Sequence, residues 1–270
     1  MTLVSSVAKR VVPEGARHGV RGTYWAARRW HERRPQEVAL RRLVEQHEGV
    51  VRGGPFAGMR SLTSMEDGCI VPKLIGCYEE EIHQWVELLI ERRPDLVIDV
   101  GCASGWYTTG FAVRLPEARV LGFDLDPGAL ARAGELARLN QVSDRVELRA
   151  ERLTPETLGA LVEPGRTLIF MDIDGPEIDV LSPELAPRLL DADVLVEFHD
   201  HFDPAISSTI VARFADTHRI MRTFATGRDP SHYRELDQFR TRWVREAAVA
   251  ERRPWQPRQE FALMLRTDAR

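Results

Sequence analysis

The chain has 270 residues, of which 43% are hydrophobic and 29% are charged, so it can form a packed core and is not disordered throughout. A net charge of −4 argues against a protein devoted to nucleic acid, and no apolar run reaches the ~18 residues of a bilayer crossing. The cysteines, Cys69, Cys77 and Cys102, lack the spacing of a disulfide framework or a zinc site. With no apolar signal segment near residue 1, we expect a reduced, cytoplasmic protein without membrane partners.

Residues 1–92 are expected to form an N-terminal arm with a helical extension. Residues 1–52 hold ten arginines and Lys9 against five glutamates, a local excess of six positive charges. Such an arm could bind an anionic partner or be a solvated leader, and the pattern favours the leader. Pro35 is suited to open a helix, residues 49–68 predict a glycine-rich loop or hairpin, and residues 78–92 predict an amphipathic helix.

Residues 93–270 alternate between short apolar runs and helical patterns. Strands are expected over 96–100, 120–123, 146–148, 167–171, 194–198, 218–224 and 261–265. Helices are expected over 108–114, 127–140, part of 176–190, and 206–214. This alternation predicts an α/β fold with a doubly wound, mostly parallel sheet. Residues 227–257 interrupt it as an insertion, with a helix expected at 233–250.

The first predicted strand runs into the loop Asp99-Val100-Gly101-Cys102-Ala103-Ser104-Gly105. Ligands of doubly wound sheets bind beyond the carboxyl ends of the strands, so this loop should border the ligand. A dinucleotide fingerprint would need glycine where Ala103 stands. The second strand ends at Asp124, whose carboxylate could accept hydrogen bonds from two ribose hydroxyls. Another acid, Glu151, follows the third strand.

This ordered pattern resembles motif I of the class I S-adenosylmethionine (SAM) methyltransferases. The resemblance implies a Rossmann-like fold with helices on both faces of a seven-stranded sheet whose last strand is antiparallel. It also implies a SAM site formed by Asp99, Gly101, Ala103, Gly105, Asp124, Leu125, Glu151 and Asp172.

Acids and histidines gather after the fourth and fifth strands, in Met171-Asp172-Ile173-Asp174-Gly175-Pro176-Glu177 and in Val196-Glu197-Phe198-His199-Asp200-His201. Both segments resemble the FkbM-like branch of the methyltransferases, with Asp174 in place of the usual glutamate. We expect His199 and Asp172 to be catalytic, because a histidine near its ordinary pKa suits proton transfer. Mg²⁺ or another divalent ion could instead be held by Asp172, Asp174, Glu197, His199 and Asp200. Asp174 could also simply cap the following helix.

The acceptor is expected to be a hydroxyl of a small molecule, such as a natural product or a sugar. The fourth strand is followed by neither the Asn/Asp-Pro-Pro-Tyr of amino-group methylases nor a Pro-Cys nucleophile, so nucleic acid is an unexpected partner. The alternatives are an RNA or protein methyltransferase guided by the arginine-rich arm, and a SAM-binding protein without turnover. The roles of Tyr78-Glu79, Trp106-Tyr107, Trp243 and Trp255 stay open between ligand contact and packing, and a homodimer is compatible with the composition.

Overall fold

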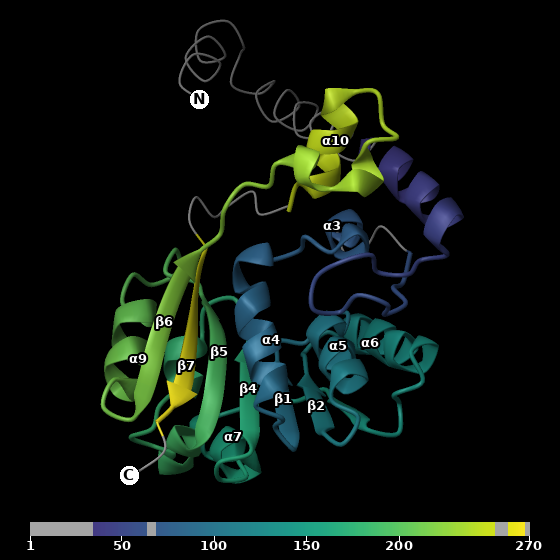
Figure 1. The fold of residues 1–270 in the computed structure, drawn as a ribbon. Helices are drawn as coiled ribbons and strands as arrows, with labels where there is room; N and C mark the ends of the chain where they lie inside the picture. The colour runs from purple at the N-terminus through teal and green to yellow at the C-terminus, as the bar shows by residue number, and fades with distance from the viewer. Residues whose placement is uncertain (1–34, 64–68, 252–258, 268–270) are drawn as a thin grey trace, which may run out of the picture.

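The computed structural model describes residues 35–63, 69–251 and 259–267. They contain a seven-stranded sheet of order β3-β2-β1-β4-β5-β7-β6 (Figure 1). The strands are β1 (Leu96–Val100), β2 (Arg119–Phe123), β3 (Val146–Arg149), β4 (Thr167–Met171), β5 (Ala192–Phe198), β6 (His218–Phe224) and β7 (Glu260–Arg266). Strands β1 to β5 are parallel, and β7 is antiparallel to both β5 and β6. The expected fold class is confirmed.

Two layers of helices cover the sheet, which explains why β1 and β4 are buried along their whole length and are apolar except for Asp99 and Thr167. One face packs against α4 (His83–Glu91), α5 (Trp106–Arg114) and α6 (Pro127–Leu139). The other face packs against α7 (Pro155–Leu161), α8 (Glu177–Val180) and α9 (Ile206–Phe214). Parallel pairing in register places the carboxyl ends of β1 to β5 at one edge of the sheet.

Three elements differ from the sequence prediction. Helix α7 was not predicted, although Thr154 forms a capping box with Thr157 ahead of a proline. The helix expected from residue 78 begins as a 3-10 turn at Glu80–Ile82, and α4 follows at His83, because Glu79 is left-handed with a φ of 52°. The helix expected over 233–250 is reduced to α10 (Arg242–Val249), after 3-10 turns at Pro230–His232 and Arg234–Leu236.

A third hydrophobic cluster lies apart from the sheet. It joins the helix over 35–47 and α3 (Ile70–Ile75) to the insertion, through buried Leu40, Leu43, Leu74, Leu236 and Ala248. We call residues 35–63, 69–76 and 230–250 the helical cap. In Figure 1 the cap lies beyond the carboxyl ends of the parallel strands, on the side where a ligand is expected.

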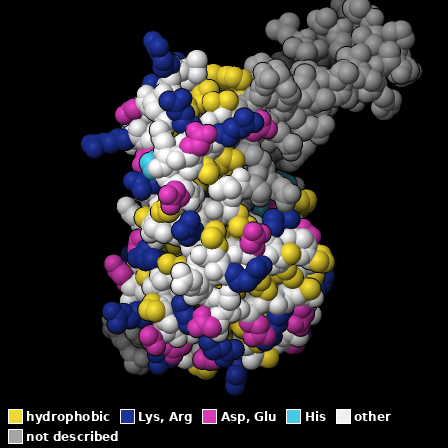
Figure 2. Space-filling model, turned by 90° about the vertical axis from the view of Figure 1, so that its right-hand side faces the viewer, with side chains coloured by type: hydrophobic (Ala, Val, Ile, Leu, Met, Phe, Trp, Pro, Cys, Tyr) yellow, Lys and Arg dark blue, Asp and Glu magenta, His cyan; other side chains and the backbone are white. Residues whose placement is uncertain are grey.

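The surface carries both signs of charge. Figure 2 shows acidic and basic side chains interspersed over the cap and the sheet domain on the face in view. Within the described ranges, no helix combines the length and the hydropathy that crossing a bilayer requires.

Candidate functional site

A cavity of about 1020 Å³ opens at the carboxyl ends of β1 to β5. Its lining after β1, β2 and β3 includes Gly101, Ala103, Asp124, Leu125 and Glu151. Its lining after β4 and at the end of β5 includes Asp172, Asp174, Glu197, His199, His201 and Phe202. The structure therefore brings together six of the eight predicted cofactor residues, all except Asp99 and Gly105, with the predicted catalytic residues in one cavity.

The loop after β1 depends on glycine at two positions. Gly101 has a φ of 88°, and a Cβ there would lie 1.7 Å from the backbone oxygen of Asp172. Gly105 has a φ of 81° and precedes α5, where a Cβ would lie 2.7 Å from that of Ala133. Real Cβ contacts are never this short, so the loop can cross β4 and approach α6 only with glycine at these positions.

Asp124 braces this loop. One of its carboxylate oxygens accepts the backbone N–H of Ala103 at 2.8 Å, and the other accepts that of Asp126 at 2.8 Å. Asp126 then caps α6 by accepting from the backbone N–H of Gly128. Asp124 thus faces the cavity with both oxygens already oriented by the backbone, as a group that is to receive further donors must be.

Asp99 lies behind the loop and is not among the residues that line the cavity. Its side chain is 1% exposed and accepts a hydrogen bond of 2.5 Å from the Thr108 hydroxyl on α5. Burial raises the pKa of Asp99 to about 7. Its contribution to the predicted SAM site is therefore to tie α5 to the end of β1.

Four acidic side chains surround His199, whose own side chain is 1% exposed. Its Nε2 lies 3.2 Å from Asp174, 3.3 Å from Glu197 and 3.5 Å from Asp172. Its Nδ1 lies 2.5 Å from Glu177, the first residue of α8. The same Glu177 oxygen accepts the backbone N–H of Gly175, so we assign the shared proton to Nδ1.

The charged groups of this cluster strongly shift one another's pKa values. Burial disfavours a charged His199, but its hydrogen bonds with Asp174, Glu177 and Glu197 prevail and raise its pKa to about 12. Burial, followed by the charges of Glu197 and Glu79, raises the pKa of Asp172 well above its usual range. The hydrogen bond with His199 lowers the pKa of Asp174. At neutral pH His199 is thus an imidazolium, which corrects the expectation that it rests near its ordinary pKa.

Donor atoms of Asp172, Asp174 and His199 lie within 4.8 Å of one another, close enough to share a cation. Asp200, which was predicted with them, is not in this group. Its carboxylate accepts the backbone N–H of Ser207 at 2.8 Å and the Ser207 hydroxyl at 2.6 Å, and so holds the first turn of α9.

The aromatic residues whose roles the sequence left open differ in their surroundings. Tyr78 lines the cavity, whereas Trp106 and Tyr107 are 8% exposed and pack against Phe56. Trp243 on α10 is 45% exposed and is not a cavity residue, and Trp255 lies outside the described residues.

One buried acid was missed as a site residue from the sequence. Glu177 had been noted only as one acid of its segment, and nothing in the spacing reveals that it faces the ring of His199. Glu79, whose role the sequence left open, is 1% exposed and accepts a hydrogen bond from the Tyr107 hydroxyl.

Comparison with known proteins agrees with the fold and the cofactor loop. Residues 97–161, from β1 through α7, match the family model described as a methyltransferase domain. Ribosomal protein L11 methyltransferase of Shigella sonnei is 38% identical over 77 residues, 28% of this chain and 26% of its own length. Malonyl-[acyl-carrier protein] O-methyltransferase of Hahella chejuensis is 38% identical over 79 residues, 28% of each chain.

A solved rRNA methylase from Streptococcus thermophilus is similar over 69% of this chain and 96% of its own, with 16% identity and a TM-score of 0.45. The two curated relatives are matched over only about a quarter of their own length. The sheet order is that of a Rossmann-like methyltransferase fold, and the match to the methyltransferase domain covers the glycine loop and the strands and helices around it. The comparisons support neither the expectation that nucleic acid is an unlikely partner nor the resemblance to the FkbM-like branch.

Proposed function

We propose that this protein transfers the methyl group of SAM to a hydroxyl of a small-molecule acceptor. The observation that carries the proposal is the single cavity that joins the loop at Gly101 to the ionisable cluster at His199. SAM supplies a methyl group activated on a sulfonium, and the protein has to bind it, hold the acceptor beside it and accept a proton. A site that only binds SAM has little use for so many ionisable groups after β4 and β5.

The residues that line the cavity after β1, β2 and β3 fit SAM. Asp124 is suited to the ribose hydroxyls, and the exposed side chains of Leu125 and Glu151 border the place of the adenine. Gly101 has no side chain, and a Cβ at this position would collide with the backbone oxygen of Asp172. We further infer that Asp172, which follows β4 beside Gly101, borders the reacting end of the cofactor.

Asp172 is the group we propose as the acceptor of the proton. Its side chain lines the cavity with 36% exposed, and its raised pKa makes it a stronger base than an ordinary carboxylate. His199 is already protonated, so its part is to orient Asp172 and to offset the negative charge around it. Glu177 in turn fixes the ring of His199 through Nδ1.

We also propose that Asp172, Asp174 and His199 can hold a divalent cation. Two carboxylates and an imidazole, with Glu197 close by, form a donor set that such ions accept. A bound cation would supply Lewis acidity that lowers the pKa of a nearby hydroxyl. Binding the cation would require His199 to release its Nε2 proton, and the contact from Glu177 to Nδ1 supports this role because it leaves Nε2 directed at the two aspartates.

A calorimetric titration with S-adenosylhomocysteine (SAH) tests the cofactor site. We expect micromolar binding to the wild type and binding about tenfold weaker or more in Asp124→Ala, which loses both oxygens that orient the loop. Asp216→Asn, at an exposed position in the turn between α9 and β6, is the matched control and should bind as the wild type does. Absence of SAH binding by the wild type would overturn the proposal.

The acceptor class is tested by SAH formation from SAM with separate panels of hydroxylated small molecules, RNA and protein. Turnover with a hydroxylated small molecule that is lost in Asp172→Asn, while SAH affinity is retained, is the expected result. Turnover with RNA or protein alone would replace the proposed acceptor by the arm-guided alternative.

A further inference from the structure

Gln259 is a buried polar residue that lines the cavity directly before β7. It is 4% exposed, and its backbone oxygen accepts the N–H of Ala225 at 2.8 Å, which continues the pairing of β6 and β7 by one residue. Its carboxamide oxygen, Oε1, has no hydrogen-bond partner among the described residues. A buried polar atom without a partner costs free energy, so a ligand in the cavity is the natural source of the missing donor.

The register of the sheet places Gln259 beside the ionisable cluster. Strands β5 and β7 are antiparallel, with Glu197 opposite Phe261. Side chains alternate between the two faces of a strand, so Gln259 lies on the same face as Phe261 and Glu197. Glu197 contacts His199 on this face, with 3.3 Å between its Oε1 and the Nε2 of the ring. Gln259 therefore borders the part of the cavity in which the reacting hydroxyl of the acceptor has to lie.

An exposed aromatic ring lies close to the same histidine. Phe202 lines the cavity and is 62% exposed. Its backbone N–H donates to the backbone oxygen of His199 at 2.9 Å, and the centroids of the two rings are 6.4 Å apart. The ring also packs against that of His201, with 4.1 Å between the centroids. A ring held in this way offers a flat apolar surface to the apolar face of a ring-shaped ligand.

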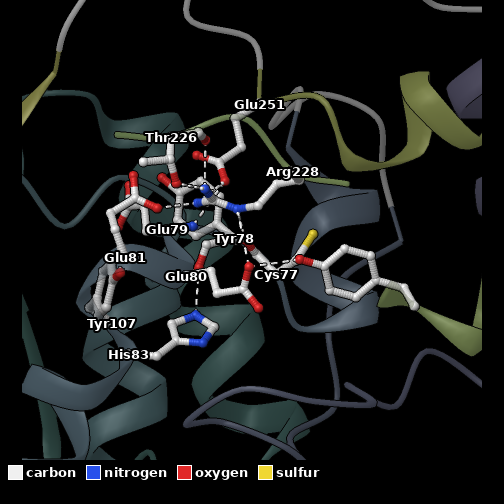
Figure 3. Close-up of polar contacts among 11 residues, drawn as sticks. Cys77, Tyr78, Glu79, Glu80, Glu81, His83, Tyr107, Thr226, Arg228 and Glu251 are labelled. Carbon is white, nitrogen blue, oxygen red and sulfur yellow. Dashed lines mark hydrogen bonds and ion pairs between the residues drawn. The ribbon is translucent and has the colours of Figure 1, made fainter. Parts of the chain in front are cut away.

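A buried ion-pair cluster fixes the wall of the cavity at Tyr78 (Figure 3). Arg228 follows β6 with its side chain 3% exposed, and it donates to the backbone oxygen of Cys77 at 2.9 Å and to Glu251 at 2.8 Å. The same oxygen of Glu251 accepts the backbone N–H of Glu79 at 3.0 Å. Because both neighbours of Tyr78 are held, this wall is preorganised. A preorganised cavity discriminates between acceptors that differ by one polar group, since it does not rearrange when that group is missing.

We propose that Gln259 binds a second hydroxyl of the acceptor, next to the hydroxyl that is methylated, and that the acceptor is a ring-shaped polyol of the sugar class. A hydroxyl suits both polar atoms of the carboxamide, because it can donate to the oxygen or accept from the nitrogen. A half turn of the carboxamide exchanges these two atoms, so either one can face the ligand. Phe202 covers the apolar face of the same ring. The inference rests on the proposed function, since it narrows the acceptor class and names a specificity residue of that site.

The test measures kcat/KM for SAH formation from SAM with the methyl glycosides of glucose, galactose and mannose, and with their monodeoxy analogues. For a glycoside that is methylated, removal of the hydroxyl next to the methylated one should lower kcat/KM of the wild type about 10- to 100-fold, because Gln259 then stays unpaired. Gln259→Met, which keeps the length of the side chain without its polar atoms, should turn over the glycoside and this analogue equally well. Calorimetry should show unchanged SAH affinity in the variant, which also shows that it is folded.

Gln238→Met is the matched control, because the Oε1 of Gln238 is also buried without a partner among the described residues but Gln238 is not a cavity residue. It should discriminate between the two acceptors as the wild type does. Phe202→Ala should raise KM for the glycoside, and Phe202→Tyr should leave it near the wild-type value.

Two results would overturn the proposal and leave the SAM site intact. One is full discrimination between glycoside and deoxy analogue in Gln259→Met, and the other is no turnover of any glycoside by a protein that binds SAH. Failure of the wild type to bind SAH would overturn the proposed function itself.

Discussion

At the scale of single residues, the site depends on positions where backbone and charge leave little freedom. Gly101 passes so close to Asp172 that any side chain would collide with its backbone oxygen. Asp99, two residues earlier, is buried with Thr108 as its hydrogen-bond partner. Because burial disfavours the ionised form of Asp99, the free energy of unfolding should depend on pH.

Asp99→Asn is expected to change that pH dependence. The pKa of Asp99 rises from 3.8 to about 7 on folding, so the folded state binds the proton more tightly than the unfolded state. The resulting penalty is absent below the unfolded pKa, grows as the pH rises toward the folded pKa, and is constant above it, with a ceiling of ~4 kcal/mol. Urea unfolding between about pH 4.5 and 8 should show that the free energy of unfolding of the variant increases relative to that of the wild type as the pH rises. A difference between the variant and the wild type that does not change with pH would contradict this expectation.

At the scale of elements, Asp200 shows how a site residue expected from the sequence can instead hold the first turn of a helix in the structure. It stands beside His199 in the chain, but successive residues at the end of β5 point in different directions. Both of its oxygens are taken by Ser207, at the start of α9. Asp200 therefore belongs to the helix rather than to the cation cluster.

Asp200→Ala is expected to lower the free energy of unfolding by about 1 to 2 kcal/mol, the usual cost of losing a cap. SAH affinity should be unchanged, because the side chain faces α9. Thermal unfolding and calorimetry on the same sample measure the two effects. Weaker binding of Mn²⁺ without any loss of stability would return Asp200 to the cation site.

At the scale of the whole molecule, the cap is built from two ends of the chain. The helix over 35–47 packs against Leu236 and Ala248, about 200 residues later in the sequence. Gln36 adds hydrogen bonds to the backbone oxygens of Ala247 and Ala250, at 2.9 and 3.2 Å. Neither segment could bury its apolar face alone, so we expect the two segments to unfold cooperatively.

Leu236→Ala removes a side chain that is fully buried in the cap, at a cost of ~2 to 4 kcal/mol. Amide hydrogen exchange should then become faster in the helix over 35–47 as well as in α10, because both lose the same core. Leu185→Ala, where the side chain is 61% exposed, is the matched control and should change neither. Faster exchange limited to residues around 236 would show that the two segments are independent.

The sequence by itself determined the strands and the cofactor loop. The bounds of β1, β4, β6 and α9 agree with the prediction, because apolar runs bounded by glycine, proline and acids are local signals. The turn at Gly101 and the position of Asp124 directly after β2 also followed from their places at strand ends.

Only the tertiary structure determined which partners the buried acidic side chains contact. Glu177 reaches His199 because α8 returns across the end of β5, and Glu79 adopts its left-handed backbone because Arg228 and Glu251 arrive from beyond β6. The same contacts shortened the predicted helix at its start. Local pattern determines where a chain is helical or extended, but the partner of a buried charge is set by packing between distant segments, which no local pattern contains.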